Sequence, residues 1–156
     1  FLHKMINILP DALLFFSIIS EYLLDRYFAI IRIIPVPINY LGLILIIVGV
    51  GLGGFTLNML KVKKTSTNAS DIPSVFITSG PFSVSRNPFY LSYMIILVGV
   101  AVLLGSLSSF IPVIISFLVL NFFVIPMEER ILGESFVGTY GQYKRRVYRW
   151  FGRRDL

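Results

Sequence analysis

The feature that most constrains this chain is a stretch of 41 residues, 87–127, that contains no charged side chain. A single membrane crossing takes about 20 apolar residues, so a run of this length predicts two crossings. Gly105 and Ser106 lie near its middle and suit a tight turn between antiparallel helices. We therefore expect spans over 88–104 and 107–126, joined as a helical hairpin.

A second uncharged stretch covers residues 33–60. Pro35 and Pro37 break its start, which leaves a predicted span over 39–59. The composition agrees with a membrane protein, because 56% of the 156 residues are apolar and 14% are charged. Soluble domains carry about 25% charged residues, so too few are present here to cover a soluble surface.

The segment 9–25 is also mostly apolar, although Asp11 and Glu21 interrupt it. We interpret it as a fourth crossing, with Asp11 at the membrane interface and Glu21 toward the far end. A re-entrant or interfacial helix is the alternative. The expected fold is a single-domain, all-α integral membrane protein over residues 1–156, with about four transmembrane helices.

The basic residues predict how these spans are oriented. Four crossings place both termini and the loop 61–87 on one side, together with twelve of the fourteen Lys and Arg residues. Only Arg26 and Arg32 fall on the other side. The positive-inside rule makes the basic side cytoplasmic. Topology and attraction to anionic lipid head groups then explain the net charge of +6, and nucleic acid is not expected as a partner.

Several kinds of site are excluded by residues that the chain lacks. It has no cysteine and one histidine, His3, which excludes disulfides, thiol nucleophiles, Ser-His-Asp triads and two-histidine metal sites. No metal is expected. Residues 49–54 match G-x-G-x-x-G, but they lie inside a predicted span without a preceding soluble strand. Gly49 and Gly53 form G-x-x-x-G instead, which predicts close helix packing rather than nucleotide binding.

The tail 127–156 is more polar and contains a helical pattern. Its apolar side chains recur at spacings of 1, 4, 4 and 3, as expected for one face of a helix on the membrane surface. These side chains are Ile131, Leu132, Phe136, Tyr140 and Tyr143. We predict a C-terminal amphipathic interfacial helix here, with Lys144-Arg145-Arg146 and Trp150 as its anchor.

Two segments bring charge to the mouths of the predicted hairpin. Arg86 ends a polar loop before Pro88, which suits the first turn of a helix. Glu128 and Glu129 stand where the last span emerges on the same face. Consecutive helical residues point about 100° apart, so one carboxylate is expected to turn inward and the other to pair with a base such as Arg130. Taken singly, Arg86 could be a snorkelling residue and the glutamates a solvated helix start.

Together, a cation and a carboxylate beside Phe82, Tyr90 and Tyr140 predict a site for a zwitterionic amino-acid ligand. The pattern resembles the isoprenylcysteine carboxyl methyltransferase and phospholipid methyltransferase superfamily of integral membrane enzymes, most of all its short prokaryotic members. The resemblance covers roughly residues 40–150. It is carried by Ser79-Gly80-Pro81-Phe82, Arg86-Asn87-Pro88-Phe89-Tyr90, Pro126-Met127-Glu128-Glu129, the aromatic residues Phe136, Tyr140 and Tyr143, and Arg145-Arg146-Val147.

The resemblance implies methyl transfer from S-adenosylmethionine at the membrane surface, with Arg86, Glu128 and Tyr90 in catalytic roles. Phe76 and Ile77 would flank the adenine. Arg86 would meet the cofactor's carboxylate or help to place the substrate, and the glutamates would receive its amino group or order that wall. The implied cofactor-binding residues are Phe76, Ile77, Gly80, Phe82, Arg86, Asn87, Tyr90, Glu128 and Glu129.

The methyl acceptor is less constrained. Prenylcysteine enzymes usually carry Arg-His-Pro where this chain has Arg86-Asn87-Pro88, and some carry a histidine at the position of Ser74. A carboxylate acceptor is already ionised at neutral pH, whereas an amine needs a base, for which Glu128, Glu129 or Tyr90 are the candidates. An isoprenylcysteine-type carboxylate is therefore favoured among lipidic or prenylated acceptors.

Other functions and one structural property stay open. A phospholipid amine is the alternative acceptor, and a non-enzymatic membrane interaction protein that keeps the fold is a further alternative. A transporter would need intramembrane charges, which the last three predicted spans lack. Membrane lipids are the expected surroundings, and the oligomeric state is open.

Overall fold

The computed structural model describes residues 2–63 and 76–154, with the side chains of the first helix from residue 8 onward. Over these residues the chain forms helices and loops, two isolated β-bridges and no strand. The elements are α1 (Leu2–Phe28), η1 (Ile38–Tyr40), α2 (Leu41–Val62), η2 (Gly80–Ser83), α3 (Pro88–Leu104), η3 (Leu107–Ser109), α4 (Phe110–Val119), the π-helix η4 (Leu120–Val124), α5 (Ile125–Ser135) and α6 (Thr139–Arg146).

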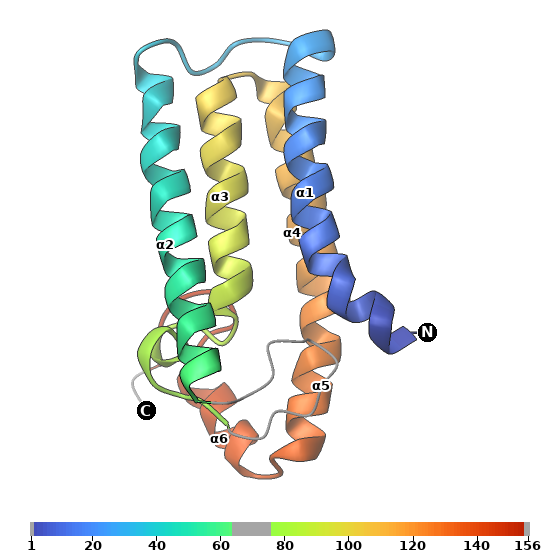
Figure 1. Ribbon diagram of the computed structural model, residues 1–156, viewed down its shortest axis with the longest axis vertical. Coiled ribbons are helices and arrows are strands. Elements are labelled where there is room, and N and C mark those ends of the chain that lie inside the picture. The colour runs from blue at the N-terminus through green and yellow to red at the C-terminus, as the bar shows by residue number, and fades with distance from the viewer. Residues whose placement is uncertain (1, 64–75, 155–156) are drawn as a thin grey trace.

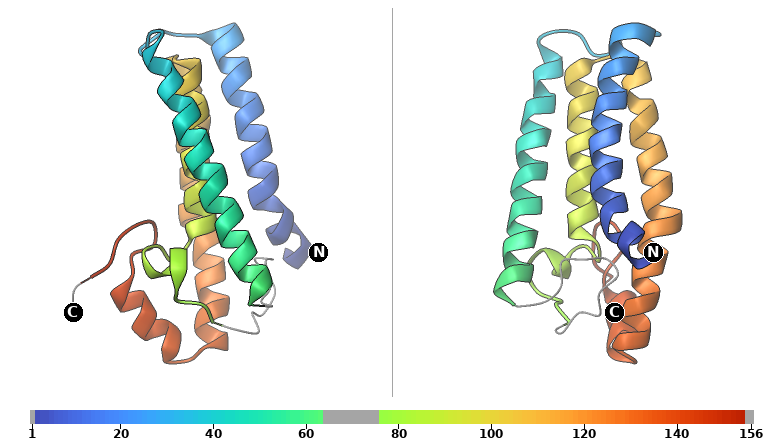
Figure 2. Two further views of the ribbon diagram at one scale, coloured as in Figure 1. Left: turned by 60° about the vertical axis from the view of Figure 1, so that its left-hand side comes forward. Right: turned by 45° about the vertical axis from the view of Figure 1, so that its right-hand side comes forward.

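The long helices stand side by side as an elongated bundle (Figure 1). α3 lies beside α2, while α1 packs against α3 and α4. Gly105 ends α3 in the left-handed conformation, with φ of 80°, and so forms the predicted hairpin turn. This turn and the α1–α2 connection lie at one end, whereas η2, α6 and the C-terminal segment gather at the opposite end (Figure 2).

Within residues 2–63 and 76–154, two helical stretches are long and apolar enough to cross a membrane. They are Ile38–Val62, of 25 residues, and Leu107–Ser135, of 29 residues. α3 is also apolar but is shorter, at 17 residues. Much of the α2 surface consists of exposed aliphatic side chains such as Ile44 and Ile47, and a continuous apolar surface is stable against lipid rather than water. These features support a membrane location; four crossings remain a prediction.

Glycines bring α2 and α3 into close contact, as the G-x-x-x-G spacing predicts. A Cβ atom at Gly49 would come within 2.6 Å of Ile96 Cγ1, and one at Gly42 within 2.3 Å of the Gly99 carbonyl oxygen. Gly53 is buried against Ser92 in the same interface. The glycine-rich stretch therefore serves helix packing.

α1 is longer than the predicted 9–25 span and packs lengthwise in the bundle. Its Ser17 Oγ lies 2.7 Å from Ser116 Oγ of α4, and both residues are buried. One turn further along, Glu21 is fully buried, and neither carboxylate oxygen has a hydrogen-bond partner among the described residues. Glu21 lies toward the far end of α1, as expected, but its side chain is on the face of the helix that packs into the bundle.

The prediction of one interfacial helix in the tail is corrected by the structure. The last apolar helix does not stop at Pro126 but continues to Ser135 as α5. The widened turn of η4 lies directly before this proline, whose missing N–H cannot complete an α-helical ladder. Gly138, with φ of 82°, then reverses the chain into the separate α6. The apolar tail residues are therefore divided between two helices.

Candidate functional site

Glu129 is the centre of a buried ion cluster at the end of the bundle that carries α6. Its side chain is 6% exposed, and its Oε1 lies 3.2 Å from Nη2 of Arg86. Its Oε2 lies 2.9 Å from Nη2 of Arg149 and 3.6 Å from Nζ of Lys144. Three cations therefore share one carboxylate. Arg86 is 9% exposed and belongs to a buried ion pair, so it is not a snorkelling residue.

Arg86 has hydrogen-bond donors that its contacts with the described residues do not use. Its Nε and Nη1 are buried and have no hydrogen-bond partner among the described residues. A guanidinium offers five N–H donors and no acceptor, and buried donors without partners cost free energy. The surplus of positive charge and the free N–H groups together fit an anionic ligand group such as a carboxylate.

The neighbouring Glu128 has a different partner. The hydroxyl of Tyr90 on α3 donates to its Oε1 at 2.6 Å. Glu128 lies two residues beyond the predicted span 107–126. Burial raises the pKa of the Glu128 carboxyl to about 7; the hydrogen bond from Tyr90 opposes this shift, and the negative charge of Glu129 adds to it. The structure thus gives Glu128 a titration in the range of a general base.

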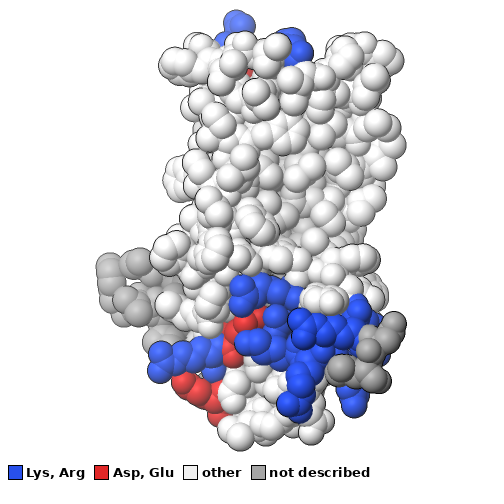
Figure 3. Space-filling view, turned by 180° about the vertical axis from the view of Figure 1, so that it is seen from behind, with Lys and Arg blue, Asp and Glu red and all other residues white. Residues whose placement is uncertain are grey.

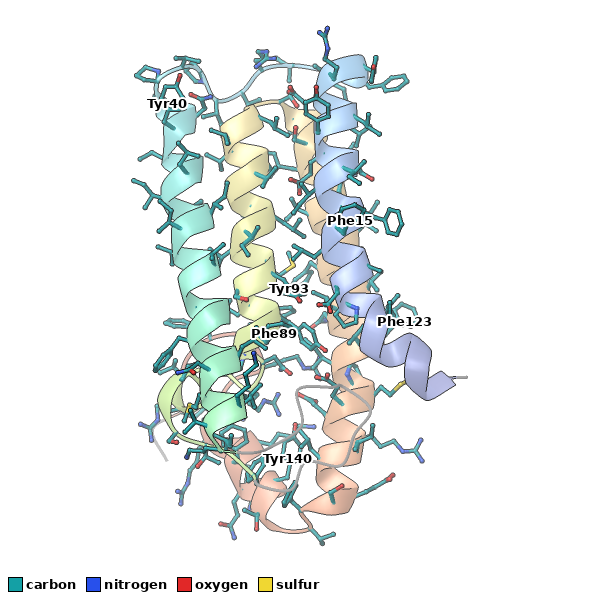
Figure 4. All side chains as sticks on the ribbon, in the orientation of Figure 1. Phe15, Tyr40, Phe89, Tyr93, Phe123 and Tyr140 are labelled. Carbon is teal, nitrogen blue, oxygen red and sulfur yellow. The ribbon has the colours of Figure 1, made fainter. Side chains whose placement is uncertain are left out.

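A second tyrosine–carboxylate pair lies one turn further along α3. The Tyr93 hydroxyl donates to Asp11 Oδ1 of α1. The Phe89 ring packs against that of Tyr93, with centroids 4.6 Å apart (Figure 4). This aromatic wall leads from α1 to the Tyr90–Glu128 pair, since the centroids of Tyr90 and Tyr93 are 6.3 Å apart.

An aromatic group joins the loop before α3 to the tail. The ring centroid of Phe76 lies 5.2 Å from that of Phe136, 5.9 Å from that of Tyr140 and 5.3 Å from that of Tyr143. Burial raises the pKa of both tyrosines, which therefore stay neutral donors. The Tyr143 hydroxyl donates to the carbonyl of Phe82 at 2.6 Å, so the predicted aromatic face is anchored to the loop.

The C-terminal segment 147–153, which we name the strap, runs beside the same loop. The backbone N–H of Arg86 donates to the Tyr148 carbonyl at 3.0 Å, and that of Gly152 donates to the Val84 carbonyl at 2.6 Å. The Asn87 side chain donates to the Arg149 carbonyl at 3.1 Å. The strap thus fixes the backbone on both sides of the Arg86 side chain.

The π-helix η4 receives the other side of the strap. Arg149 Nη1 donates to both the carbonyl and the Oδ1 of Asn121, at 3.2 and 3.3 Å. Trp150 Nε1 donates to the same Oδ1 at 3.1 Å, and its ring lies 5.2 Å from that of Phe117. Trp150 therefore packs against α4 and hydrogen-bonds within the protein, and its role as an interfacial anchor stays a prediction.

The structure brings most of the predicted site residues together, but with other partners. Arg130 pairs with Glu134 at 2.9 Å on the exposed face of α5, so the expected Glu–Arg130 contact is wrong. Ile77 is buried, and Gly80, with φ of 60°, lies against Met59 of α2 rather than in the ion cluster. Ser74 lies outside the described residues.

Sequence reasoning missed the roles of Arg149, Lys144 and Asn121. From the sequence, Arg149 is only a charge on the basic side of the protein, and Lys144 is part of the predicted interfacial anchor. Asn121 carried a signal, because it is a polar side chain inside the uncharged run. Its partners come from the tail, and the spacing of residues along the chain does not identify them.

The charged surface is concentrated at this same end. Figure 3 shows Lys and Arg side chains gathered below a broad uncharged belt, with few charges beyond the belt at the other end. The one-sided distribution read from the sequence is therefore present in the folded chain.

Comparisons with known proteins give the family. The family model described as phospholipid methyltransferase matches residues 38–139, which is more than half of the chain. The chain belongs to the phospholipid methyltransferase family. This family lies within the superfamily that the sequence motifs resemble, and membership indicates a membrane methyltransferase. The matched region begins at η1 and ends at the first residue of α6, so α1 and the strap lie outside it.

One relative has a name that describes no activity. An uncharacterised protein of Haemophilus influenzae is 41% identical over 61 residues, which make up 39% of this chain and 97% of that protein. No solved structure matches this chain.

Proposed function

We propose that this chain is an integral membrane methyltransferase that moves a methyl group from S-adenosylmethionine to a lipidic or prenylated acceptor. The family match supports the reaction class. The observation that carries the proposal is the buried Arg86, whose Nε and Nη1 have no partner among the described residues beside a carboxylate shared by three cations. A ligand with a carboxylate complements this site.

The residues present fit the cofactor. Arg86 would hold its carboxylate, Glu128 is placed to receive its amino group or to act on the acceptor, and the aromatic group around Phe76 would border its adenine. S-adenosylmethionine supplies an electrophilic methyl group on a sulfonium. The task of the protein is then to align the acceptor with that methyl group and to exclude water.

We propose four crossings, with this site on the cytoplasmic side. α1, α2, α3 and the rod from α4 to α5 lie side by side in one bundle (Figure 1). The concentration of Lys and Arg at the end that carries the site supports the cytoplasmic assignment.

The Tyr90–Glu128 pair favours an amine head group as the acceptor. The sequence alone favours a carboxylate acceptor, because a carboxylate is already ionised at neutral pH and needs no base. Glu128, with its pKa raised to about 7, is such a base. Its carboxylate would take the proton of an ammonium group. The lone pair of the free amine then forms the bond to the methyl carbon, and the sulfur keeps the electrons of the broken bond.

Calorimetric titration of the detergent-purified protein with S-adenosylhomocysteine tests the cofactor assignment. We expect the wild type to bind and Arg86→Ala to lose most of the affinity, because the variant lacks the cation for the carboxylate. Arg130→Gln is the matched control, since Arg130 is exposed and pairs only with Glu134 among the described residues. Absence of binding by the wild type, or equal binding by Arg86→Ala, contradicts the proposal.

Transfer of an isotope-labelled methyl group tests the acceptor. The protein is reconstituted with a phospholipid bearing a primary amine head group or with a prenylated cysteine bearing a free carboxylate, and the products are analysed by mass. We expect labelled amine product, and its loss in Glu128→Gln. Labelling of the prenylated carboxylate alone would reverse the choice of acceptor but leave the methyltransferase assignment intact.

A further inference from the structure

Arg149 of the strap makes more contacts with the candidate site than its position in the sequence suggests. Its guanidinium meets Glu129 through two nitrogens, Nη2 to Oε2 at 2.9 Å and Nε to Oε1 at 3.3 Å. Its Nη1 meets Asn121 of the π-helix. Its carbonyl oxygen accepts hydrogen bonds from the side chains of Asn87, at 3.1 Å, and Ser85, at 3.5 Å.

Arg86 and Arg149 make unequal contacts with the carboxylate of Glu129. Arg149 contacts both carboxylate oxygens, whereas Arg86 reaches one of them through Nη2 alone. A carboxylate and a guanidinium prefer a two-point contact when nothing prevents it. Arg149, which contacts both oxygens, and Lys144, which lies 3.6 Å from Oε2, therefore compete with Arg86 for a two-point pair with Glu129.

We propose that Arg149 is a positioning residue that holds Glu129 so that Nε and Nη1 of Arg86 stay available for the carboxylate of the methyl donor. This inference rests on the proposed function. Without Arg149, Glu129 would turn toward Arg86 and occupy a donor that the ligand needs. The cluster would also lose one of its three cations, which weakens its attraction for an anion.

The π-helix explains why Arg149 can perform this task. Its Nη1 is fixed by both oxygens of Asn121, and Trp150 binds the same side-chain oxygen. π-helical turns are rare in proteins, and those that are present often lie at functional sites. The contacts thus run from η4 through Arg149 to Glu129 and then to Arg86, and the strap, which lies outside the family-matched region, completes the site.

A pair of ligands that differ by one carboxylate separates positioning from general structural support. Binding of S-adenosylmethionine and of decarboxylated S-adenosylmethionine is measured by calorimetry for the wild type, Arg149→Gln and Arg145→Gln. Arg145 is an exposed arginine of α6 and serves as the control for lost charge. We expect Arg149→Gln to weaken the binding of S-adenosylmethionine about tenfold, which is the equivalent of one charge-assisted hydrogen bond. The affinity for the decarboxylated ligand should change less than about twofold.

Each other result overturns the inference. An equal loss for both ligands would make Arg149 a support of the fold alone, and no loss for either would remove its role. A similar selective loss in Arg145→Gln would assign the effect to net charge. If the wild type binds neither ligand, the proposed function itself fails, which is a distinct outcome.

A second variant covers the case in which Arg149→Gln is not recovered folded. Arg149→Lys keeps the charge but replaces the planar guanidinium with one ammonium nitrogen, which cannot reproduce the two-point contact with Glu129 while it reaches Asn121. We expect a smaller loss of affinity, confined to the ligand with the carboxylate. Full retention of that affinity by Arg149→Lys would show that the two-point contact is not needed and would overturn the inference.

Discussion

Glu128 and Glu129 are neighbours in the sequence but belong to two different regions of the site. Glu128 faces α3 and accepts a hydrogen bond from the neutral hydroxyl of Tyr90. Glu129 faces the loop and the tail and is bound by Arg86, Lys144 and Arg149. Consecutive helical residues point about 100° apart, so one turn of α5 serves both regions.

Because their partners differ, we assign a chemical role to Glu128 and a structural role to Glu129. Burial allows Glu128 to change protonation near neutral pH, whereas Glu129 forms ion pairs with three cations. Glu129 ties together three segments that are distant in sequence: the loop before α3, α6 and the strap. We therefore expect substitutions at Glu129 to act on stability and those at Glu128 to act on turnover.

The largest effect is expected for Glu129→Gln. The variant leaves Arg86 and Arg149 close together without their counter-charge, and removal of one partner from a buried ion pair costs about 3–5 kcal/mol. Denaturant unfolding in detergent measures the loss. Glu134→Gln, an exposed glutamate on the same helix, is the control and should unfold like the wild type. Wild-type stability in Glu129→Gln would mean that the ion cluster does not assemble this end of the protein.

Glu128→Gln should keep the fold but lose turnover with an amine acceptor. The amide cannot take the ammonium proton, and general-base groups contribute about 10²- to 10⁴-fold to rates. Labelled methyl transfer in lipid nanodiscs gives the rate, and calorimetry with S-adenosylhomocysteine monitors the cofactor site. A rate within a few-fold of the wild type would show that Glu128 is not the base. The proposed difference between Glu128 and Glu129 would then not concern catalysis.

The pH dependence of the methyl-transfer rate tests whether Glu128 is the general base. The wild-type rate should rise as pH increases through about 7, because only the ionised carboxylate accepts a proton. The hydrogen bond from Tyr90 lowers the pKa of Glu128, so Tyr90→Phe should raise that pKa and move the midpoint to higher pH. Tyr93→Phe, one turn along α3, is the control and should leave the midpoint in place. An unmoved midpoint in Tyr90→Phe argues against titration of Glu128.

Patterns within one helix or one hairpin could be predicted from the sequence, and they predict the structure well here. The 41-residue uncharged run predicted the hairpin at Gly105, and the spacing of Gly49 and Gly53 predicted a close helix–helix contact, for which the structure supplies α3 as the partner of α2. The motif segments also gave the family. In each case the physical cause lies in residues a few positions apart, where helical period and turn geometry decide the outcome.

The partners within the site could not be predicted in this way. Arg149 reaches Glu129 only because Gly138 reverses the chain and the strap returns to η4. The spacing of the tail aromatics predicted one continuous helix, but Phe76 gathers them across the break instead. These contacts depend on how distant segments fold back on one another, which helical periodicity does not encode.

Arg130 gives the smallest expected effect and the cleanest test of which cations matter. Helical spacing makes it a plausible partner for a neighbouring glutamate, yet it pairs with Glu134 on the exposed face of α5. Exposed pairs of this kind contribute little, because water and salt screen them. Arg130→Gln should therefore leave the melting temperature and the affinity for S-adenosylhomocysteine unchanged. A loss comparable to that in Glu129→Gln would mean that Arg130, and not Arg149, balances the buried carboxylate. The assignment of Glu128 and Glu129 to two regions with different partners would then be wrong.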